Sequence, residues 1–568
     1  KCNPAIKAPN NRTALWQALL DDRLDVIATD HAPHTLEEKG YFRNTDNTLS
    51  LLTGTAAEGR YEKSHAGLPL VQHSLLLMLY YVKEGKITIE KVVENKYDLV
   101  ILDETMPGLD GLSTLQEIKR INPALPIVMV TKSEEEGLMD KAIASQISDY
   151  LIKPINPNQI IMAIKKIFQA DEIRANQIGQ QYTRFIAELN QKLFATPDWN
   201  EWSEIYRELS YWELQIDQVN DEGLRQTHFL EKRNCNTEFT NYVERNYSNW
   251  LKSDERPNLS FDLISQYIAP HFEENLPIYF IIVDCMRLDQ YLAIQPYIQE
   301  LFDEELELYY SILPTATPYS RNSIFSGLMP IDIAKRFPDY WVTSSEMDNS
   351  RNRNEHQLLD EHIEELGFKL DPTSKYVKIF NMEEGNFVLR KIETWNKENL
   401  IVLVYNFLDL LAHHRSRDQI LQETIPNEEG LRAFTKHWFL HSSLYEALKL
   451  IAKQDAIVIL STDHGSIKVN RATQVIGDKE TSITVRYKEG KNLSVNERHA
   501  LFVKKPGEFG LPSKSIVDNF IFAKDDYYFV YPNAYHQYQK QFNGTFQHGG
   551  VSMEEMILPI ATCRTKRR

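Results

Sequence analysis

The stretch Ala456-Ile-Val-Ile-Leu-Ser-Thr-Asp-His-Gly465 joins an apolar run of strand length to two polar side chains, Asp463 and His464. A short apolar run of this kind predicts a buried strand. The acidic residue that follows it then lies at the carboxyl end of the strand. In an open α/β sheet, the carboxyl ends of neighbouring strands meet in one crevice, where ligands bind. The stretch therefore predicts a functional site at one edge of a parallel sheet.

Two more apolar runs lead into an acidic side chain, and a histidine lies in a glycine-rich stretch near the C-terminus. The side chains that they add are Asp284 after Pro277–Val283, Asp409 and His413 after Leu400–Tyr405, and His548 before Gly549-Gly550. Such a set of carboxylates and imidazoles would be a costly cluster unless divalent cations neutralised it. Mixed carboxylate and imidazole ligands suit Zn²⁺, with Mn²⁺ as the alternative.

A hydroxyl-rich segment lies between the apolar runs Pro277–Val283 and Leu400–Tyr405. Its sequence is Leu313-Pro-Thr-Ala-Thr-Pro-Tyr-Ser-Arg-Asn322. A hydroxyl beside a bound metal can lose its proton and attack phosphorus. On chemistry alone, the hydroxyls that compete for this role are those of Thr315, Thr317, Ser320 and Ser323. Arg321 either neutralises phosphoryl oxygens or forms a surface salt bridge.

The series Asp-x-x-x-His, Asp-His-Gly and a late His-Gly resembles the alkaline-phosphatase superfamily, and most closely its PglZ branch. The resemblance implies two metals and an in-line displacement through a phospho-threonine. It selects Thr317 as the nucleophile that bridges the metals, and His414 is an alternative to His413. The ligand sets that it implies are Asp409, His413 and His548 for one metal, and Asp284, Asp463 and His464 for the other.

Further upstream, three apolar strands end at Asp103, Thr131 and Lys153. Together they resemble the second half of a flavodoxin-like response-regulator receiver. The resemblance implies that Asp103 accepts a phosphoryl group from a sensor histidine kinase, Thr131 senses it, and Lys153 is its charge partner. Intact receivers hold Mg²⁺ with acidic residues that precede the phospho-acceptor, and these are missing here. We therefore expect a phosphoryl donor to label Asp103 poorly.

Residues 1–94 contain Asp25-Val-Ile-Ala-Thr-Asp-His-Ala-Pro-His34, which resembles the last part of dihydroorotase, a (β/α)₈ barrel enzyme. The resemblance implies a metal-centre role for Asp30 and substrate contact for His34. The early His-x-His pair of that family is absent, and a quarter of a barrel cannot bury a core. We interpret Asp30, His31 and His34 as vestigial and expect no dihydroorotase activity.

The chain thus reads as an α/β multidomain protein with an abrupt change of character near residue 94. We expect a barrel fragment at 1–94, a partial receiver at 95–170, a helical connector at 171–260 and a PglZ-type hydrolase at 261–568. Apolar and aromatic residues recur at helical spacing between Trp199 and Trp212, which predicts the packed seam of a small helical bundle.

Composition limits the function classes. The net charge of −17 argues against sequence-independent binding to a nucleic-acid backbone. No apolar run is long enough to span a membrane, and the four cysteines are scattered, as is typical of reduced thiols. We therefore expect a cytoplasmic protein without membrane insertion.

The order receiver, helical connector and PglZ domain resembles response regulators of the type IX secretion system. The resemblance implies dimerisation on phosphorylation and zinc-dependent cleavage of nucleotide or oligonucleotide phosphodiesters. It also implies contacts with a sigma factor or secretion components. The alternative is a signalling module that works mainly through protein contacts, with catalysis secondary.

Overall fold

The computed structural model describes residues 41–43, 49–51, 98–104, 111–131, 147–341, 352–371, 373–416, 418–477, 484–513, 515 and 517–566. These belong to two compact units, Lys1–Ala170 and Asp171–Arg568, and each unit is described by itself. The barrel-type residues Asp30, His31 and His34 lie outside the described residues. Within the described ranges, no helix combines the length and apolar character that crossing a membrane requires.

The first unit contains a parallel sheet of three described strands in the order β3-β4-β5, namely Val100–Asp103, Ile127–Thr131 and Asp149–Ile152. Helix α4 is Gly111–Ile121, and α6 is Pro157–Phe168, capped by Asn156. A separate antiparallel pair joins β1 (Tyr41–Arg43) to β2 (Leu49–Leu51). The three strands predicted for the receiver are confirmed, with ends shifted by a residue or so, and a helix follows β3 and another follows β5.

The second unit is built on a six-stranded sheet in the order β7-β19-β10-β6-β9-β8. These strands are Phe302–Tyr310, Ile557–Thr565, Ile457–Ser461, Ile278–Val283, Leu400–Tyr405 and Lys375–Ile379. Strands β10, β6, β9 and β8 run parallel, and β19 runs antiparallel to β10 and β7. Val283 pairs with Tyr405 and Ile282 with Ser461, so β6, β9 and β10 end at nearly the same level.

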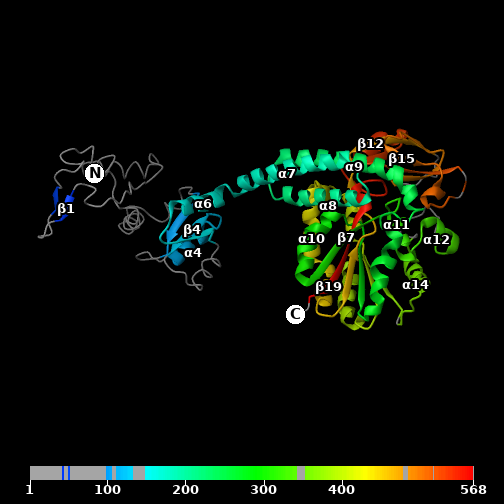
Figure 1. Ribbon diagram of the computed structural model, residues 1–568, viewed down its shortest axis with the longest axis horizontal. Coiled ribbons are helices and arrows are strands. Elements are labelled where there is room, and N and C mark those ends of the chain that lie inside the picture. The colour runs from blue at the N-terminus through cyan, green and yellow to red at the C-terminus, as the bar shows by residue number, and fades with distance from the viewer. Residues whose placement is uncertain are drawn as a thin grey trace. The chain divides into compact units, whose positions relative to one another are not determined.

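Helices cover both faces of this sheet (Figure 1). One face packs against α10 (Leu288–Leu301), α15 (Met382–Lys391), α18 (Glu428–His441) and α19 (Ser443–Ile451). The other packs against α11 (Thr317–Ser326) and α14 (Glu355–Glu365). The three central strands are buried along their whole length, as their unbroken apolar runs predict.

The connector forms three long helices, α7 (Ala170–Phe194), α8 (Trp199–Ile216) and α9 (Glu222–Trp250). Asp198 and Glu201 form a capping box that starts α8. The helices are confirmed, but their aromatic seam is not that of a separate bundle. Trp202 belongs to the same core cluster as Tyr310 of β7, whose hydroxyl donates to the Trp199 carbonyl over 2.7 Å. The connector helices and the segments around the six-stranded sheet therefore share one core.

Smaller elements complete the second unit. Strand β11 (Ile467–Lys468) pairs with β18 (Phe546–Gln547), and this pairing brings the chain after residue 547 back beside β10. The other strands are β12 (Arg471–Ile476), β13 (Tyr487–Lys491), β14 (Ser494–Val495), β15 (Ala500–Val503), β16 (Asp518–Ala523) and β17 (Tyr527–Val530). Further α-helices among the described residues are α12 (Pro330–Arg336), α16 (Phe407–Arg415), α17 (Gln419–Thr424), α20 (Tyr535–Phe542) and α21 (Met553–Met556).

Candidate metal centre

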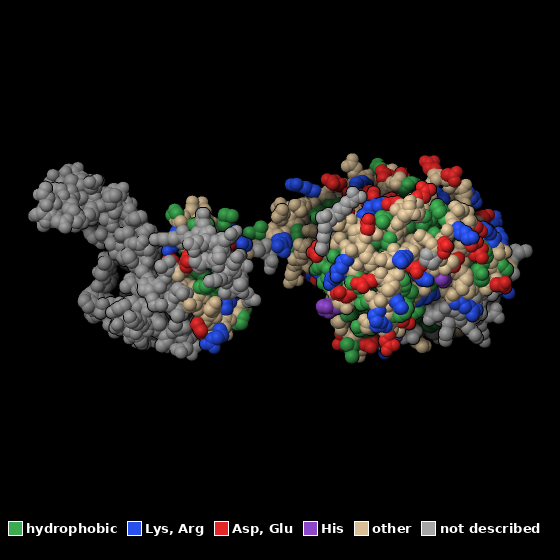
Figure 2. Space-filling view, turned by 90° about the horizontal axis from the view of Figure 1, so that it is seen from below, with side chains coloured by type: hydrophobic (Ala, Val, Ile, Leu, Met, Phe, Trp, Pro, Cys, Tyr) green, Lys and Arg blue, Asp and Glu red, His purple; other side chains and the backbone are tan. Residues whose placement is uncertain are grey.

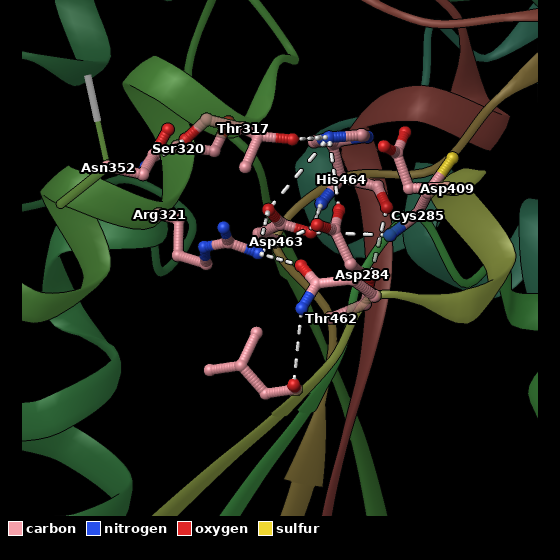
Figure 3. A network of polar contacts seen from close by, with 12 residues as sticks. Asp284, Cys285, Thr317, Ser320, Arg321, Asn352, Asp409, Thr462, Asp463 and His464 are labelled. Carbon is pink, nitrogen blue, oxygen red and sulfur yellow. Dashed lines mark hydrogen bonds and ion pairs between the residues drawn. The ribbon is translucent and has the colours of Figure 1, made fainter. Parts of the chain in front are cut away.

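The predicted ligands come together at the carboxyl edge of the six-stranded sheet. Asp284 directly follows β6, the Asp463-His464 pair follows β10, and Asp409 lies in the first turn of α16 after β9. Thr317 is the first residue of α11, and its hydroxyl points toward His464 in Figure 3. The convergence expected for strand ends of an open α/β sheet is thus present.

Asp409, His413 and His548 form a near-equilateral triangle of ligand atoms. Asp409 Oδ1 lies 3.4 Å from the Nε2 atoms of both histidines, which are 3.3 Å from each other. A tetrahedron with metal–ligand bonds of about 2.0–2.1 Å has edges of about 3.3–3.4 Å. The triangle therefore has the dimensions of one face of a tetrahedral zinc site. His413, and not His414, supplies its second imidazole.

A second group consists of Asp284, Asp463 and His464, whose ligand atoms lie within 4.8 Å of one another. All three side chains are buried, and His464 Nε2 is 3.7 Å from Asp284 Oδ1. His464 also groups with Asp409 and His548 within the same limit, and its ring stacks on that of His548. The two groups therefore adjoin, as two metals served by one nucleophile require.

The backbone requires a glycine directly after His464 and another directly after His548. A Cβ on Gly465 would lie 1.9 Å from the Glu554 carbonyl oxygen, so only glycine lets the Asp-His loop pass α21. Gly549 has φ of +113°, a conformation that turns the chain away directly after His548. The Asp-His-Gly and His-Gly patterns thus have local backbone reasons.

Each of the three carboxylates presents one oxygen without a hydrogen-bond donor, namely Asp284 Oδ1, Asp409 Oδ1 and Asp463 Oδ2. The second oxygen of Asp284 accepts from Arg321 Nη1 over 2.7 Å, and that of Asp463 accepts from the backbone N–H of His464 over 3.1 Å. A buried carboxylate oxygen without a hydrogen-bond donor destabilises the folded state by several kcal/mol unless a cation lies beside it. The donor set and its unpartnered oxygens fit divalent metal ions.

The electrostatics agree with this assignment. Burial, together with the negative charge of Asp463, raises the pKa of Asp284 well above its usual value, while Arg321 opposes the shift. Burial lowers the pKa of His464 to about 4, so its imidazole is neutral at pH 7 and has a lone pair to donate. Burial would also raise the pKa of Asp409, but His413 and His548 outweigh it and hold that pKa well below its usual range.

Of the four hydroxyls that competed on chemistry, Thr317 is the one that contacts a candidate ligand, with Oγ1 2.9 Å from His464 Nε2. Thr315 donates to the Gly550 carbonyl over 2.8 Å, and Ser320 bonds Ser311 over 2.9 Å. The Ser323 hydroxyl is buried without a partner. Geometry therefore favours Thr317.

Arg321 differs from the expectation. Its side chain is only 3% exposed, so the surface salt bridge is wrong. Its guanidinium bonds Asp284, Asn406 and Glu355, and Glu355 in turn bonds Asn352. Sequence reasoning missed Asn352, Glu355 and Asn406. Only Asn406 had a signal, because it directly follows a buried strand.

In the first unit, the three receiver residues lie at the carboxyl ends of three adjacent parallel strands. The Lys153 ammonium forms an ion pair with the Asp103 carboxylate, and the Thr131 hydroxyl donates to Glu104. Asp103 and Lys153 thus lie in direct contact, as the receiver resemblance implies.

Three family models match the chain in succession. A response regulator receiver domain matches residues 72–165, a PorX response regulator linker domain matches 172–251, and a BREX system PglZ alkaline phosphatase-like domain matches 263–563. The chain belongs to the PglZ alkaline phosphatase-like family. It combines this domain with a receiver and a PorX-type linker, the arrangement of a PorX-like response regulator. The receiver match includes residues 72–94, which the sequence placed in the barrel-like segment and which lie outside the described residues.

Known relatives match the receiver part of this PglZ protein. Chemotaxis protein CheY of Thermotoga maritima is 30% identical over 15% of this chain and 69% of its own length. The Bacillus subtilis regulator ResD is 32% identical over 15% of the chain and 36% of its own. A CheY-like receiver structure from Methanospirillum hungatei JF-1 is 22% identical over 14% of this chain and 62% of that chain, with a TM-score of 0.13.

Proposed function

We propose that this PglZ protein is a two-component response regulator whose output domain hydrolyses phosphodiesters of the nucleotide type with two Zn²⁺ ions, or Mn²⁺ in their place. One ion would be held by Asp409, His413 and His548, and the other by Asp284, Asp463 and His464. The observation that carries the proposal is the set of three unpartnered carboxylate oxygens beside a triangle of zinc-like dimensions.

The bound ions would supply charge neutralisation and would lower the pKa of the attacking hydroxyl. Thr317 attacks phosphorus through Oγ1 as its proton leaves, and the bond to one alcohol breaks as that alcohol takes up a proton. A threonine-linked phosphoryl ester forms that keeps the second alcohol of the diester. Water then cleaves the Oγ1–phosphorus ester and regenerates the hydroxyl. Thr317 is the first residue of the ten-residue helix α11, whose amino end favours the negative charge that develops on Oγ1 and the phosphoryl oxygens.

The protein cations near this helix support a diester rather than a monoester. Arg321 bonds Glu355 over 2.6 Å and Asp284 over 2.7 Å, and Lys378 bonds Glu355 over 2.8 Å. Both cations are thus turned to carboxylates and not to the phosphoryl position. A diester carries one negative charge and a monoester about two, so a site that offers few free cations favours the diester.

The test compares hydrolysis of bis-p-nitrophenyl phosphate and of p-nitrophenyl phosphate by the full chain, with Zn²⁺ and with chelator. We expect zinc-dependent cleavage, faster for the diester, that is lost in Thr317→Ala. Ser323→Ala is the matched control, because it removes a buried hydroxyl of the same helix that contacts no candidate ligand. Equal activity of Thr317→Ala and wild type would contradict the proposed nucleophile.

The receiver implies phosphorylation by a sensor histidine kinase. We extend the proposal to a cytoplasmic location and a role in type IX secretion through a sigma factor or secretion components. The receiver resemblance also implies phospho-acceptance by Asp103 and dimerisation on phosphorylation, but we expect Asp103 of this chain to be labelled poorly. A module that works chiefly through protein contacts is the second candidate, and the shared core of linker and hydrolase favours it. Full partner binding by Thr317→Ala, with no turnover by wild type, would put that candidate first.

The surface supports a small, locally recognised substrate. Figure 2 shows acidic and basic side chains interspersed over the visible face of the second unit, without an extended basic stripe on that face. Sequence-independent binding of a long nucleic acid relies on such a stripe.

A further inference from the structure

The surroundings of Arg321 form a closed arrangement behind the metal centre. The Arg321 residue is 3% exposed, and its guanidinium is contacted by side-chain oxygens from three separate segments. Nη1 lies 2.7 Å from Asp284 Oδ2 and 3.3 Å from Asn406 Oδ1, while Nε lies 2.6 Å from Glu355 Oε1. Figure 3 shows the Arg321 side chain reaching toward Asp284 and Asp463.

This contact determines which oxygen of Asp284 is left for a metal. Arg321 takes Oδ2, and Oδ1 remains without a donor. The same Nη1 lies 3.9 Å from Asp463 Oδ2, the unpartnered oxygen of the second aspartate. A single fixed cation therefore stands beside both carboxylates of one ligand set.

Glu355 holds Arg321 in place and connects it to the nucleophile. Its side chain is fully buried and accepts from Arg321, Lys378 and Asn352. The amide of Asn352 also donates to the Thr317 carbonyl oxygen over 3.1 Å. Arg321 and Glu355 thus lie in one network with a metal ligand at one end and the nucleophile's backbone at the other.

We propose that Arg321 is a built-in cation and a positioning residue of the metal centre. It compensates the Asp284 and Asp463 carboxylates permanently and turns Asp284 so that Oδ1 faces the ions. The proposal rests on the metal centre of the proposed function. It adds that the guanidinium occupies a place lined by hard oxygen donors, Asp284 Oδ2, Asn406 Oδ1 and Glu355 Oε1. Oxygen donors of this kind suit Mg²⁺ once the guanidinium is removed.

Two substitutions separate the two parts of this role. Arg321→Lys keeps the charge but cannot bond Asp284 and Glu355 through separate nitrogens, so it tests orientation. Arg321→Met removes the charge and opens space beside three oxygens, so it tests compensation. Lys378→Met is the matched control, because Lys378 bonds Glu355 and the Asn352 carbonyl rather than the carboxylate of a candidate ligand.

The experiment measures zinc affinity of the full chain by competition with a chromophoric chelator, and the melting temperature with and without millimolar Mg²⁺. We expect Arg321→Lys to bind zinc about 10–100-fold more weakly than wild type, the usual effect of removing a group that orients a ligand. Mg²⁺ should raise the melting temperature of Arg321→Met but leave wild type and Lys378→Met unchanged.

Wild-type zinc affinity in Arg321→Lys, or no response of Arg321→Met to Mg²⁺, overturns the proposal. If Arg321→Met does not fold, the zinc affinity of Arg321→Lys still decides. Failure of the proposed function looks different, because wild type itself would then bind no zinc or cleave no ester.

Discussion

The second unit contains two buried charge clusters that differ in how their carboxylates are bonded. In the metal cluster, Asp284, Asp409 and Asp463 each leave one oxygen without a donor. A paired cluster lies where the linker meets the hydrolase segments. Its most buried members, all at most 6% exposed, are three cations and three carboxylates: Lys232, Arg287, Arg432, Glu213, Asp289 and Glu554.

Every carboxylate oxygen of these three buried acidic residues has a protein donor. Lys232 lies 2.6 Å from Glu213 and 3.0 Å from Glu554, and Arg432 lies 3.0 Å from Glu213 and 2.9 Å from Asp289. Arg287 and Asn236 complete the set through Asp289 Oδ1 and Glu554 Oε2. The comparison teaches that buried charge alone does not mark a site. The metal cluster differs because several oxygens without a hydrogen-bond donor converge there, so that one or two bound cations could neutralise them together.

The largest expected difference concerns activity. Asp463→Asn should lower turnover of bis-p-nitrophenyl phosphate by at least about 10³-fold, because it removes a metal-facing carboxylate. The free energy of unfolding in chelator should not fall, since the substitution relieves repulsion between Asp463 and Asp284. Urea unfolding of the metal-free chain measures this second quantity. A clear destabilisation would mean that the metal cluster is also structural.

The next effect concerns stability. Lys232→Met leaves Glu213 and Glu554 buried without their shared cation, so it should destabilise the second unit by about 3–5 kcal/mol in urea unfolding. Lys449→Met is the control, because Lys449 pairs with Glu446 on the surface and should contribute less than about 1 kcal/mol. If Lys232→Met lowered the free energy of unfolding as little as Lys449→Met does, the paired cluster would not depend on its internal charge pairing, and the contrast with the metal cluster would be wrong.

Metal binding gives a smaller but specific effect. Zinc at a hundred times its dissociation constant should stabilise the folded chain by about 2.7 kcal/mol per ion, measured as a shift of the urea midpoint. The shift should persist in Lys232→Met and be reduced in Asp463→Asn. Equal shifts in these two variants would mean that zinc binds elsewhere.

The smallest effect is expected in the first unit. The Asp103 carboxylate is bonded to Lys153, and from the sequence we expect the acidic Mg²⁺ ligands of intact receivers to be missing before it. A phosphoryl donor with Mg²⁺ should therefore label the chain poorly, as measured by intact mass. Stoichiometric labelling that disappears in Asp103→Ala would contradict this.

The parts of the site that follow strands could be predicted from sequence. Unbroken apolar runs identify β6, β9 and β10, and parallel pairing places Asp284, Asp409 and Asp463 at one edge. The choice of Thr317 over Ser320 needed either the family resemblance or the geometry, because all the hydroxyls there are chemically alike.

The supporting residues could not be predicted, because they depend on long-range packing. Glu355 begins α14, and nothing in its local sequence indicates that it lies against Arg321. The same holds for the aromatic seam of α8, whose spacing predicts a helix but not its partner. Side-chain periodicity fixes which face is buried, whereas the covering element is set by tertiary contacts.

The most direct test titrates the metal-free full chain with Zn²⁺ while following hydrolysis of bis-p-nitrophenyl phosphate. The unpartnered oxygens predict that activity rises with zinc and saturates at two ions per chain, and that chelator abolishes it. Hydrolysis that is independent of zinc, or saturation by zinc without any hydrolysis, would contradict the account.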